Sequence, residues 1–171
     1  MEAIGAGVSH VQPGDRVSIQ PLIMPRAGDY FADRGLFHLS PELALAGLSW
    51  AWGGMAEAAL LNDYNVAKIP DSLSDEEAAL VEPSAVAVYS CDRGGVRAGA
   101  SVLVTGAGPI GLLTVLAARA AGAGPLFVSD LNDARLAYAK SIVPELITIN
   151  PKRENVGEMV RAQTEGCLLY T

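Results

Sequence analysis

Residues 106–111 have the types and spacing of a phosphate-binding turn. They read GAGPIG, which is the pattern G-x-G-x-x-G, and they follow a short apolar run at 101–105. Gly106 allows a tight turn out of a strand, Gly108 leaves the backbone open to a diphosphate, and Gly111 lets the next helix pack closely on the sheet. The amide groups and the dipole at the start of that helix favour an anion. The residues predicted to bind a dinucleotide here are Gly106, Gly108, Pro109, Ile110 and Gly111.

Asp130 completes this pattern. It lies 22 residues beyond Gly108, at the end of a second apolar run at 126–128. A carboxylate at that place accepts hydrogen bonds from the adenosine ribose and repels the 2′-phosphate of NADP, so NAD is the predicted cofactor. Ser129 weakens that preference without supplying the arginine pair that a 2′-phosphate would need. Two alternatives stay open: a glycine-rich turn with a helix-capping aspartate, and a site for S-adenosylmethionine or flavin.

Strands and helices alternate from about residue 100 onward. Short apolar runs typical of buried parallel strands are each followed by a longer helical segment. The expected strands are 101–105, 126–128 and 146–149, and the expected helices are 109–121, 133–142 and 156–163. Short connections between such elements require a parallel sheet with right-handed crossovers. The sequence therefore predicts an α/β fold with part of a Rossmann-type parallel sheet.

The region before residue 70 reads as short strands and turns. Residues 12–15, QPGD, are typical of a turn, and the alternation in 16–20 predicts a half-buried strand. Residues 25–54 lack a clear period and are expected to form a long surface loop or lobe. Residues 55–61 and 65–69 are candidates for further strands, although the first of them would also fit a helix.

Two signals predict helices between these regions. Ser74 followed by Glu77 is a capping box, in which side chains satisfy backbone donors at a helix start. The apolar segment 83–90 begins with a proline, which is tolerated in the first turn of a helix. The chain is therefore expected to become helical between about residues 74 and 90.

Composition argues against several classes of partner. The 171 residues include 12 basic and 19 acidic side chains, a net charge of −7, so the basic surface that nucleic acids or anionic membranes need is missing. No run approaches the ~20 apolar residues of a membrane helix, and no signal peptide is visible at the start, so a cytoplasmic location is expected. Cys91 and Cys167 lie far apart and predict two unrelated thiols, neither a disulfide framework nor a structural zinc lobe.

Four motifs, in this order along the chain, resemble those of the medium-chain dehydrogenase/reductase family, most closely its butanediol and sorbitol dehydrogenase branch. They are VQPGDRV at 11–17, GGMAE at 53–57, EAALVEPSAVA at 77–87 and VLVTGAGPIGL at 102–112. The resemblance covers nearly the whole chain. It implies part of a mainly-β GroES-like catalytic domain at 1–84, followed by part of a Rossmann domain at 85–166.

The same resemblance implies an activity and roles for single residues. In this family a zinc ion lowers the pKa of the hydroxyl of a secondary alcohol, and C4 of NAD takes the hydride. Glu82 matches the position that reaches the zinc directly or through water, which makes it the predicted catalytic and metal-binding residue; the alternative is a charged residue at a helix entrance. Val86 resembles the residue that packs against the nicotinamide ring. Arg135 matches a basic position that contacts the adenosine ribose, the alternative being an exposed arginine near Asp133.

Two departures from the family pattern concern the metals. The family's zinc-binding cysteine and its Gly-His-Glu motif would lie before residue 1, and His10 and His38 are interpreted as surface or structural residues. The loop 21–52 has no cysteines, whereas many relatives place a set of them there around a structural zinc, so no structural zinc is predicted. The residues expected to replace it by aromatic packing are Tyr30, Phe31, Phe37, Trp50 and Trp52.

Residues 167–171 interrupt the expected continuation and are treated as a non-native tail. With only part of the nucleotide domain present, the chain is expected to be an internal fragment that is itself inactive. Its parent is predicted to be a homo-oligomeric, zinc- and NAD-dependent dehydrogenase whose small-molecule substrate is a secondary alcohol, a 2,3-butanediol-like diol or a polyol. The alternatives are a zinc-free quinone or enoyl reductase, against which Glu82 in its VEPS context argues, and a non-catalytic nucleotide-binding module.

Overall fold

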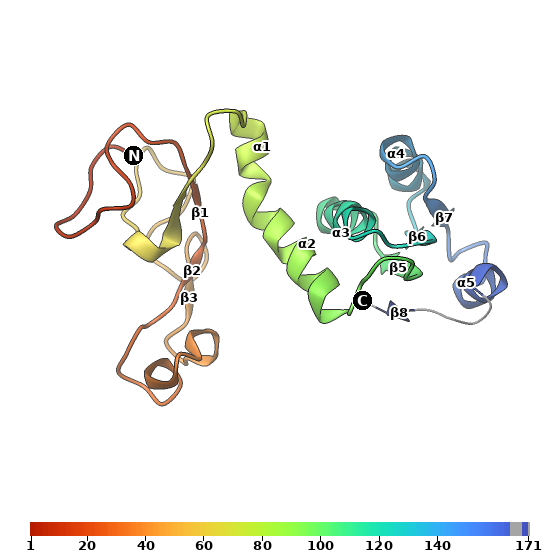
Figure 1. Ribbon diagram of the computed structural model, residues 1–171, viewed down its shortest axis with the longest axis horizontal. Helices are drawn as coiled ribbons and strands as arrows, with labels where there is room; N and C mark the ends of the chain where they lie inside the picture. Colours follow the sequence, from red (N-terminus) through yellow and green to blue (C-terminus); the bar gives the residue numbers. More distant parts are fainter. Residues whose placement is uncertain (165–168, 171) are drawn as a thin grey trace. The chain divides into compact units, whose positions relative to one another are not determined.

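The chain divides into two units. The computed structural model describes residues 1–164 and 169–170 (Figure 1). Contacts within the chain separate a first unit, Met1–Glu82, from a second, Pro83–Thr171. The junction falls inside helix α2 (Val81–Arg93), and the boundary expected after residue 84 lies in the same helix. Each unit is described by itself below.

The first unit contains two short antiparallel strand pairs. Strand β1 (Val17–Ile19) pairs with β4 (Val66–Lys68), and β2 (Leu22–Ile23) pairs with β3 (Ala44–Leu45). The strands expected within 16–20 and 65–69 are therefore confirmed. Three single-turn 3₁₀ helices connect these strands: η1 (Ala32–Arg34), η2 (Phe37–Leu39) and η3 (Asp63–Asn65).

The strand or helix expected at 55–61 does not form. Among the described residues this segment has only bends and irregular backbone. Met55 and Leu60 are exposed, at 107% and 73% of their reference surface. A short strand is stable only where a neighbouring strand pairs with it and one of its faces is covered, and this segment has neither.

Side-chain contacts hold the lobe between β2 and β3. The Asp29 carboxylate accepts hydrogen bonds from the N–H groups of Phe31 and Ala32 and from the Ser40 hydroxyl, at 2.7–2.9 Å. The Ala32 N–H, the Ser40 hydroxyl and the Phe31 N–H, in that order, hold the pKa of Asp29 below its usual value. The guanidinium of Arg26 lies over an aromatic ring of the lobe, 4.4 Å from the centroid of Phe37.

Two residues of η3 connect this lobe to β4. The Tyr64 hydroxyl accepts a hydrogen bond from the Met24 N–H and donates one to the Met24 carbonyl. Arg26 covers the Tyr64 ring at 4.0 Å. Asn65 is 1% exposed, and its amide donates to the carbonyls of Gln20 and Leu22 at 2.6 and 2.7 Å. Of the aromatics expected to pack the lobe, Phe37 does so, whereas Trp50 and Trp52 keep 43% and 46% of their surface exposed.

The capping box forms as predicted and starts helix α1 (Asp75–Ala79). The Ser74 hydroxyl accepts from the Glu77 N–H at 3.1 Å, and the Glu77 carboxylate accepts from the Ser74 N–H at 2.8 Å. This second bond lowers the pKa of Glu77. Helix α2 follows almost at once, with Pro83 in its first turn, where the missing N–H of proline costs nothing.

The second unit is a four-stranded parallel sheet with the strand order β7-β6-β5-β8. The strands are β5 (Val102–Thr105), β6 (Leu126–Ser129), β7 (Ile147–Ile149) and β8 (Leu169–Tyr170). The helices are α3 (Pro109–Ala120), α4 (Asp133–Ile142) and α5 (Val156–Thr164). The expected α/β class with a Rossmann-type parallel sheet is thus confirmed.

Part of the segment 167–171, which the sequence analysis treats as a non-native tail, pairs with the sheet as β8. Leu169 and Tyr170 pair in parallel with Val102 and Leu103. A sheet edge offers backbone N–H and C=O groups, which pair with a neighbouring strand irrespective of its side chains. The rest of the expected tail, 167–168 and 171, lies outside the described residues.

Alternate side chains of the sheet enter two separate cores. Val102, Val104 and Val128 pack with residues of α3 and α4, among them Val115 and Leu136. The intervening positions face the opposite way and pack with α5; these are Leu103 and Phe127, which contact Ile149 and Val160. Helices therefore cover both faces of the sheet, which explains why its strands are continuous apolar runs instead of alternating ones.

Candidate functional site

The loop after β5 needs glycine at two places. Gly106 has φ +98°, in the region that other residues rarely adopt, and its N–H donates to the Ser129 carbonyl at 2.7 Å. A Cβ placed on Gly111 would lie 1.8 Å from the Gly106 carbonyl oxygen. The two glycines therefore let the chain leave β5 sharply and bring α3 directly against the turn.

The middle glycine has a different role. Gly108 is the N-cap of α3 with an extended backbone, φ −79° and ψ −176°, so its conformation does not require glycine. A Cβ there would meet no protein atom within 4 Å. Pro109 opens the helix, no side chain caps it, and Ile110 beside it is 46% exposed. The loop thus presents bare backbone and uncapped amide donors to open space, the surface that a diphosphate requires.

Asp130, directly after β6, is bonded to this loop. One carboxylate oxygen, Oδ2, accepts from the Ala107 N–H at 2.8 Å, and Oδ1 accepts from the Asn132 N–H at 2.8 Å. The side chain is 10% exposed. These two bonds, the Ala107 bond first, hold the pKa of Asp130 below its usual value, so the group is an anion at neutral pH. An ionised carboxylate next to the glycine loop can accept further hydrogen bonds from hydroxyl groups.

Arg135, in the first turn of α4, lies beside this carboxylate. Its Nη1 is 3.8 Å from Oδ2 of Asp130, and the side chain is 59% exposed. Asp133, which lies near Arg135 in the sequence, pairs with Arg153, whose two nitrogens donate to it at 2.6 and 2.8 Å. The structure therefore brings the predicted residues of the glycine loop together with Asp130 and Arg135 at the carboxyl ends of strands β5 and β6.

Sequence reasoning missed two asparagines at this edge. Asn132 is the N-cap of α4: its Oδ1 accepts from the Ala134 and Arg135 N–H groups, while its own N–H reaches Asp130. An asparagine just before a helical segment is a recognisable capping signal, and it would have identified this residue. Asn150, after β7, has no capping signal of this kind, and the partners of its side-chain amide, Leu131 and Asp133, lie 17–19 residues away in the sequence.

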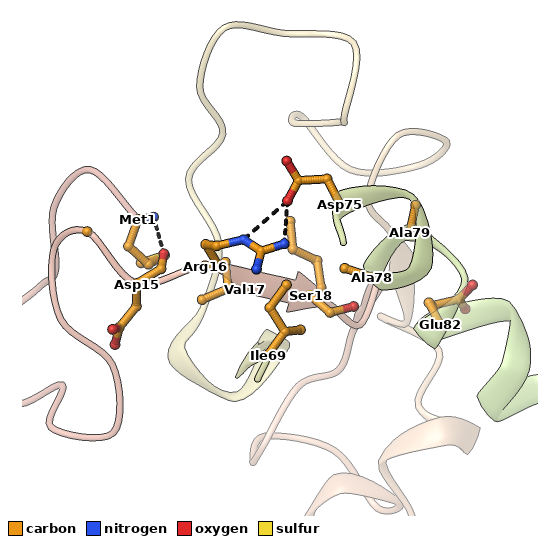
Figure 2. A pocket seen from close by; sticks show the side chains of 12 residues that line it. Met1, Asp15, Arg16, Val17, Ser18, Ile69, Asp75, Ala78, Ala79 and Glu82 are labelled. Carbon is orange, nitrogen blue, oxygen red and sulfur yellow. Dashed lines mark hydrogen bonds and ion pairs between the residues drawn. The ribbon is translucent and has the colours of Figure 1, made fainter. Parts of the chain in front are cut away.

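Glu82 lies in the first unit, on the first turn of α2. It lines an open pocket of about 730 Å³, together with Arg16 and Asp75 (Figure 2). Nε and Nη2 of Arg16 donate to Oδ1 of Asp75 at 3.2 and 2.6 Å. Val86, one turn further along α2, belongs to the second unit and is 44% exposed.

The described residues do not by themselves fit a zinc ion. Nowhere in 1–164 or 169–170 do three or more His, Cys, Asp or Glu side chains gather in a group that could hold a metal. A zinc site in proteins takes three or four such ligands. Glu82 could supply one of them, and the others would have to come from outside the described residues.

Comparison with known proteins places the chain among dehydrogenases. No family model matches it. It is 40% identical to human sorbitol dehydrogenase over 168 residues, which is 98% of this chain and 46% of that protein. The chain thus spans about half the length of the curated relatives that it matches. In the described part of the chain, no helix combines the length and the apolar composition needed to cross a membrane.

Three of the solved structures that share its fold illustrate the likeness. The 2R,3R-butanediol dehydrogenase of Bacillus subtilis has a TM-score of 0.82 at 32% identity, over 95% of this chain and 45% of that one. An alcohol dehydrogenase of Escherichia coli, complexed with NADH, has a TM-score of 0.84 at 31% identity, over 96% and 48%. A zinc-binding dehydrogenase of Sinorhizobium meliloti, bound to NADP, has a TM-score of 0.82 at 30% identity, over 90% and 44%.

These likenesses extend over nearly all of this chain and agree with the four motifs that it carries. They confirm the resemblance stated from the sequence. Over nearly its whole length the chain is similar to sorbitol and butanediol dehydrogenases, as the resemblance to the medium-chain dehydrogenase/reductase family implies.

Proposed function

We propose that the protein carrying this sequence is an NAD-dependent dehydrogenase that oxidises a secondary alcohol, diol or polyol to the ketone. The observation that carries the proposal is the 2.8 Å hydrogen bond from the Ala107 N–H to Asp130. It joins the glycine loop to an anionic acceptor in the strand–turn–helix context of a dinucleotide site. Two of the structural neighbours hold NADH and NADP, which supports a pyridine nucleotide as the cofactor.

Within this proposal, each residue of the candidate dinucleotide site has a separate role. The diphosphate lies over the bare backbone at 106–111, where the dipole of α3 favours its charge. Each Asp130 oxygen already accepts one backbone N–H and retains a lone pair for a ribose hydroxyl. The same charge disfavours a 2′-phosphate, so NAD is preferred over NADP. Arg135 lies beside the ribose position, and Val86 is the candidate for contact with the nicotinamide.

NAD supplies the chemistry by accepting a hydride at C4 of its nicotinamide ring. The chain's own residues bind and orient it. Because Glu82 is the sole zinc-ligand candidate that the family pattern identifies in this chain, we assign no step to zinc. Glu82 stays a proposed catalytic or metal-binding residue at the wall of its pocket.

The substrate class follows from the relatives. One of them is a sorbitol dehydrogenase and another a 2R,3R-butanediol dehydrogenase, so a small polyol or vicinal diol is the proposed substrate. A homo-oligomeric state and a cytoplasmic location, without nucleic acid or membrane partners, remain predictions from the sequence.

Titration with NADH and NADPH, followed by assays with NAD and a panel that includes sorbitol and 2,3-butanediol, tests the proposal. We expect tighter binding of NADH and oxidation of at least one diol or polyol. Turnover that a chelator abolishes would add zinc to the mechanism, and Glu82→Ala should then lose activity while Glu76→Ala, an exposed control, keeps it. Absence of NADH binding would overturn the proposal. NADH binding without turnover of any alcohol would favour the non-catalytic module.

A further inference from the structure

Asn150 is a buried polar residue at the edge of the candidate nucleotide site. It follows β7 directly and is 2% exposed. A buried amide is costly unless its donors and acceptor are all bonded, and those of Asn150 are. Its Oδ1 accepts from the Lys152 N–H at 3.0 Å. Its backbone N–H donates to Oε2 of Glu154 at 3.1 Å. Asn150 therefore organises the turn that leads from β7 to α5.

The side-chain amide of Asn150 points away from this turn, to the loop after β6. Its Nδ2 donates to Oδ1 of Asp133 at 2.7 Å and has a longer contact of 3.5 Å with the Leu131 carbonyl. Arg153, from the same turn, donates hydrogen bonds from two guanidinium nitrogens to the Asp133 carboxylate. The 150–153 turn thus holds the loop 131–133 through one buried amide and one guanidinium.

That loop holds the ribose-binding candidate. Asn132 lies between Leu131 and Asp133, and its N–H donates to Oδ1 of Asp130. The other oxygen of Asp130 accepts from Ala107 of the glycine loop. A continuous series of hydrogen bonds and adjacent residues therefore runs from Asn150 to the phosphate-binding loop.

We infer that Asn150 is a positioning residue of the dinucleotide site, which sets the geometry of Asp130 through Leu131 and Asp133. This inference rests on the proposed function. A carboxylate that must accept two ribose hydroxyls while keeping two backbone bonds tolerates little displacement, because hydrogen bonds weaken steeply with misalignment. Supporting residues that fix a binding side chain contribute to affinity without touching the ligand.

The substitution Asn150→Ala tests this role. Removal of the amide frees the Leu131–Asp133 loop from β7, and we expect NADH to bind about tenfold more weakly. The protection of the Ala107 N–H against hydrogen exchange should fall by a similar factor. In the catalytically active protein, the KM for NAD should rise while kcat stays within about twofold, since the loss concerns binding.

The matched control is Asn155→Ala. Asn155 is an exposed asparagine whose Oδ1 accepts from the Glu158 N–H at the start of α5, so its removal also costs a helix-start bond. Within the described residues, its side chain hydrogen-bonds to Glu158 and not to the loop after β6. Its variant should unfold more readily than the unchanged chain, with the NADH affinity and the Ala107 protection unaltered.

Exchanging the amide and the carboxylate between positions 150 and 133 distinguishes a positioning role of Asn150 from a general loss of stability. Asn150→Asp alone places a carboxylate oxygen against Asp133 and should weaken NADH binding more than Asn150→Ala does. Adding Asp133→Asn restores the donor and acceptor of this one pair in reversed order but removes an acceptor from Arg153, so the double variant should recover part of the affinity that Asn150→Asp loses.

Two failures are distinguishable. If the unchanged chain does not bind NADH, the proposed function is overturned. If it binds NADH but Asn150→Ala leaves both the affinity and the Ala107 protection unchanged, the proposed function stands and the role of Asn150 is overturned.

Discussion

The two units hold their loops by different means. In the first unit, the lobe between β2 and β3 is fixed by side-chain contacts, some of them between distant parts of the sequence. Tyr64 contacts Met24, and Arg26 covers the rings of Phe37 and Tyr64. The strands of this unit are two or three residues long, so backbone pairing contributes little.

In the second unit, the candidate binding loop is fixed by the backbone. Gly106 and Gly111 meet at a separation that no side chain would allow, and Asp130 accepts two backbone N–H groups. Both ends of the loop continue into a strand and a helix that are buried in the sheet cores. The comparison teaches that a loop built on backbone constraints leaves a short pattern in the sequence, whereas a loop built on side-chain contacts does not.

The largest expected effect comes from Gly111→Ala. The new Cβ would lie 1.8 Å from the Gly106 carbonyl oxygen, so α3 must move, at a cost of about 3 kcal/mol in the free energy of unfolding. Gly108→Ala is the matched control, because its Cβ enters open space. It should change stability by less than about 1 kcal/mol and yet weaken NADH binding about tenfold. Denaturant unfolding measures the stability of the two variants, and titration with NADH measures their affinity. Equal stability of the two variants would contradict the conclusion that close backbone packing at Gly111 fixes the loop.

Asp130→Ala should weaken NADH binding about thirtyfold, since ribose hydroxyls lose an ionised acceptor. NADPH binding should fall by less than about threefold, because repulsion of the 2′-phosphate disappears together with that acceptor. Parallel titrations with the two nucleotides measure the ratio. If the ratio of the NADH and NADPH affinities is unchanged by the substitution, Asp130 does not contact the ribose.

Arg26→Ala tests the side-chain account of the first unit. Loss of its contacts with the Phe37 and Tyr64 rings should cost about 1 kcal/mol in the free energy of unfolding. Arg34→Ala, which removes an exposed contact with one ring, that of Tyr30, and a hydrogen bond to the Tyr30 carbonyl, should cost less. NADH binding should be the same in both variants. A weaker affinity in either one would show that the lobe contributes to the nucleotide site.

The smallest effect concerns pH. Backbone donors lower the folded-state pKa of Asp130 below its usual 3.8, so its contribution to stability is present above that value and is lost as the pH falls through the lower, folded-state pKa. NADH affinity should therefore be constant between about pH 5 and 8. Protection of the Ala107 N–H should decline only in more acidic solution. A decline near neutral pH would show that another group controls the loop.

Much of the second unit could be predicted. The helix 133–142 agrees with α4, and the strands expected at 101–105 and 126–128 correspond to β5 and β6. These elements are signalled by local apolar periodicity and by glycines whose conformations are locally required. In the first unit the segment 55–61 was wrongly expected to be a regular element, because its composition resembles both a strand and a helix and it has no pairing partner.

Local patterns in the sequence are sufficient to predict the class of the fold, the glycine loop and the position of its acidic partner, because turn geometry and strand alternation are local properties. The tertiary structure decided that Asp130 bonds to Ala107, that Arg135 lies beside Asp130 while Arg153 takes Asp133, and that Asn150 reaches the loop after β6. The bonds from Ala107 to Asp130, from Arg153 to Asp133 and from Asn150 to Asp133 join residues about twenty positions apart. They arise only once parallel strands bring their carboxyl ends to one edge, and no local pattern records them.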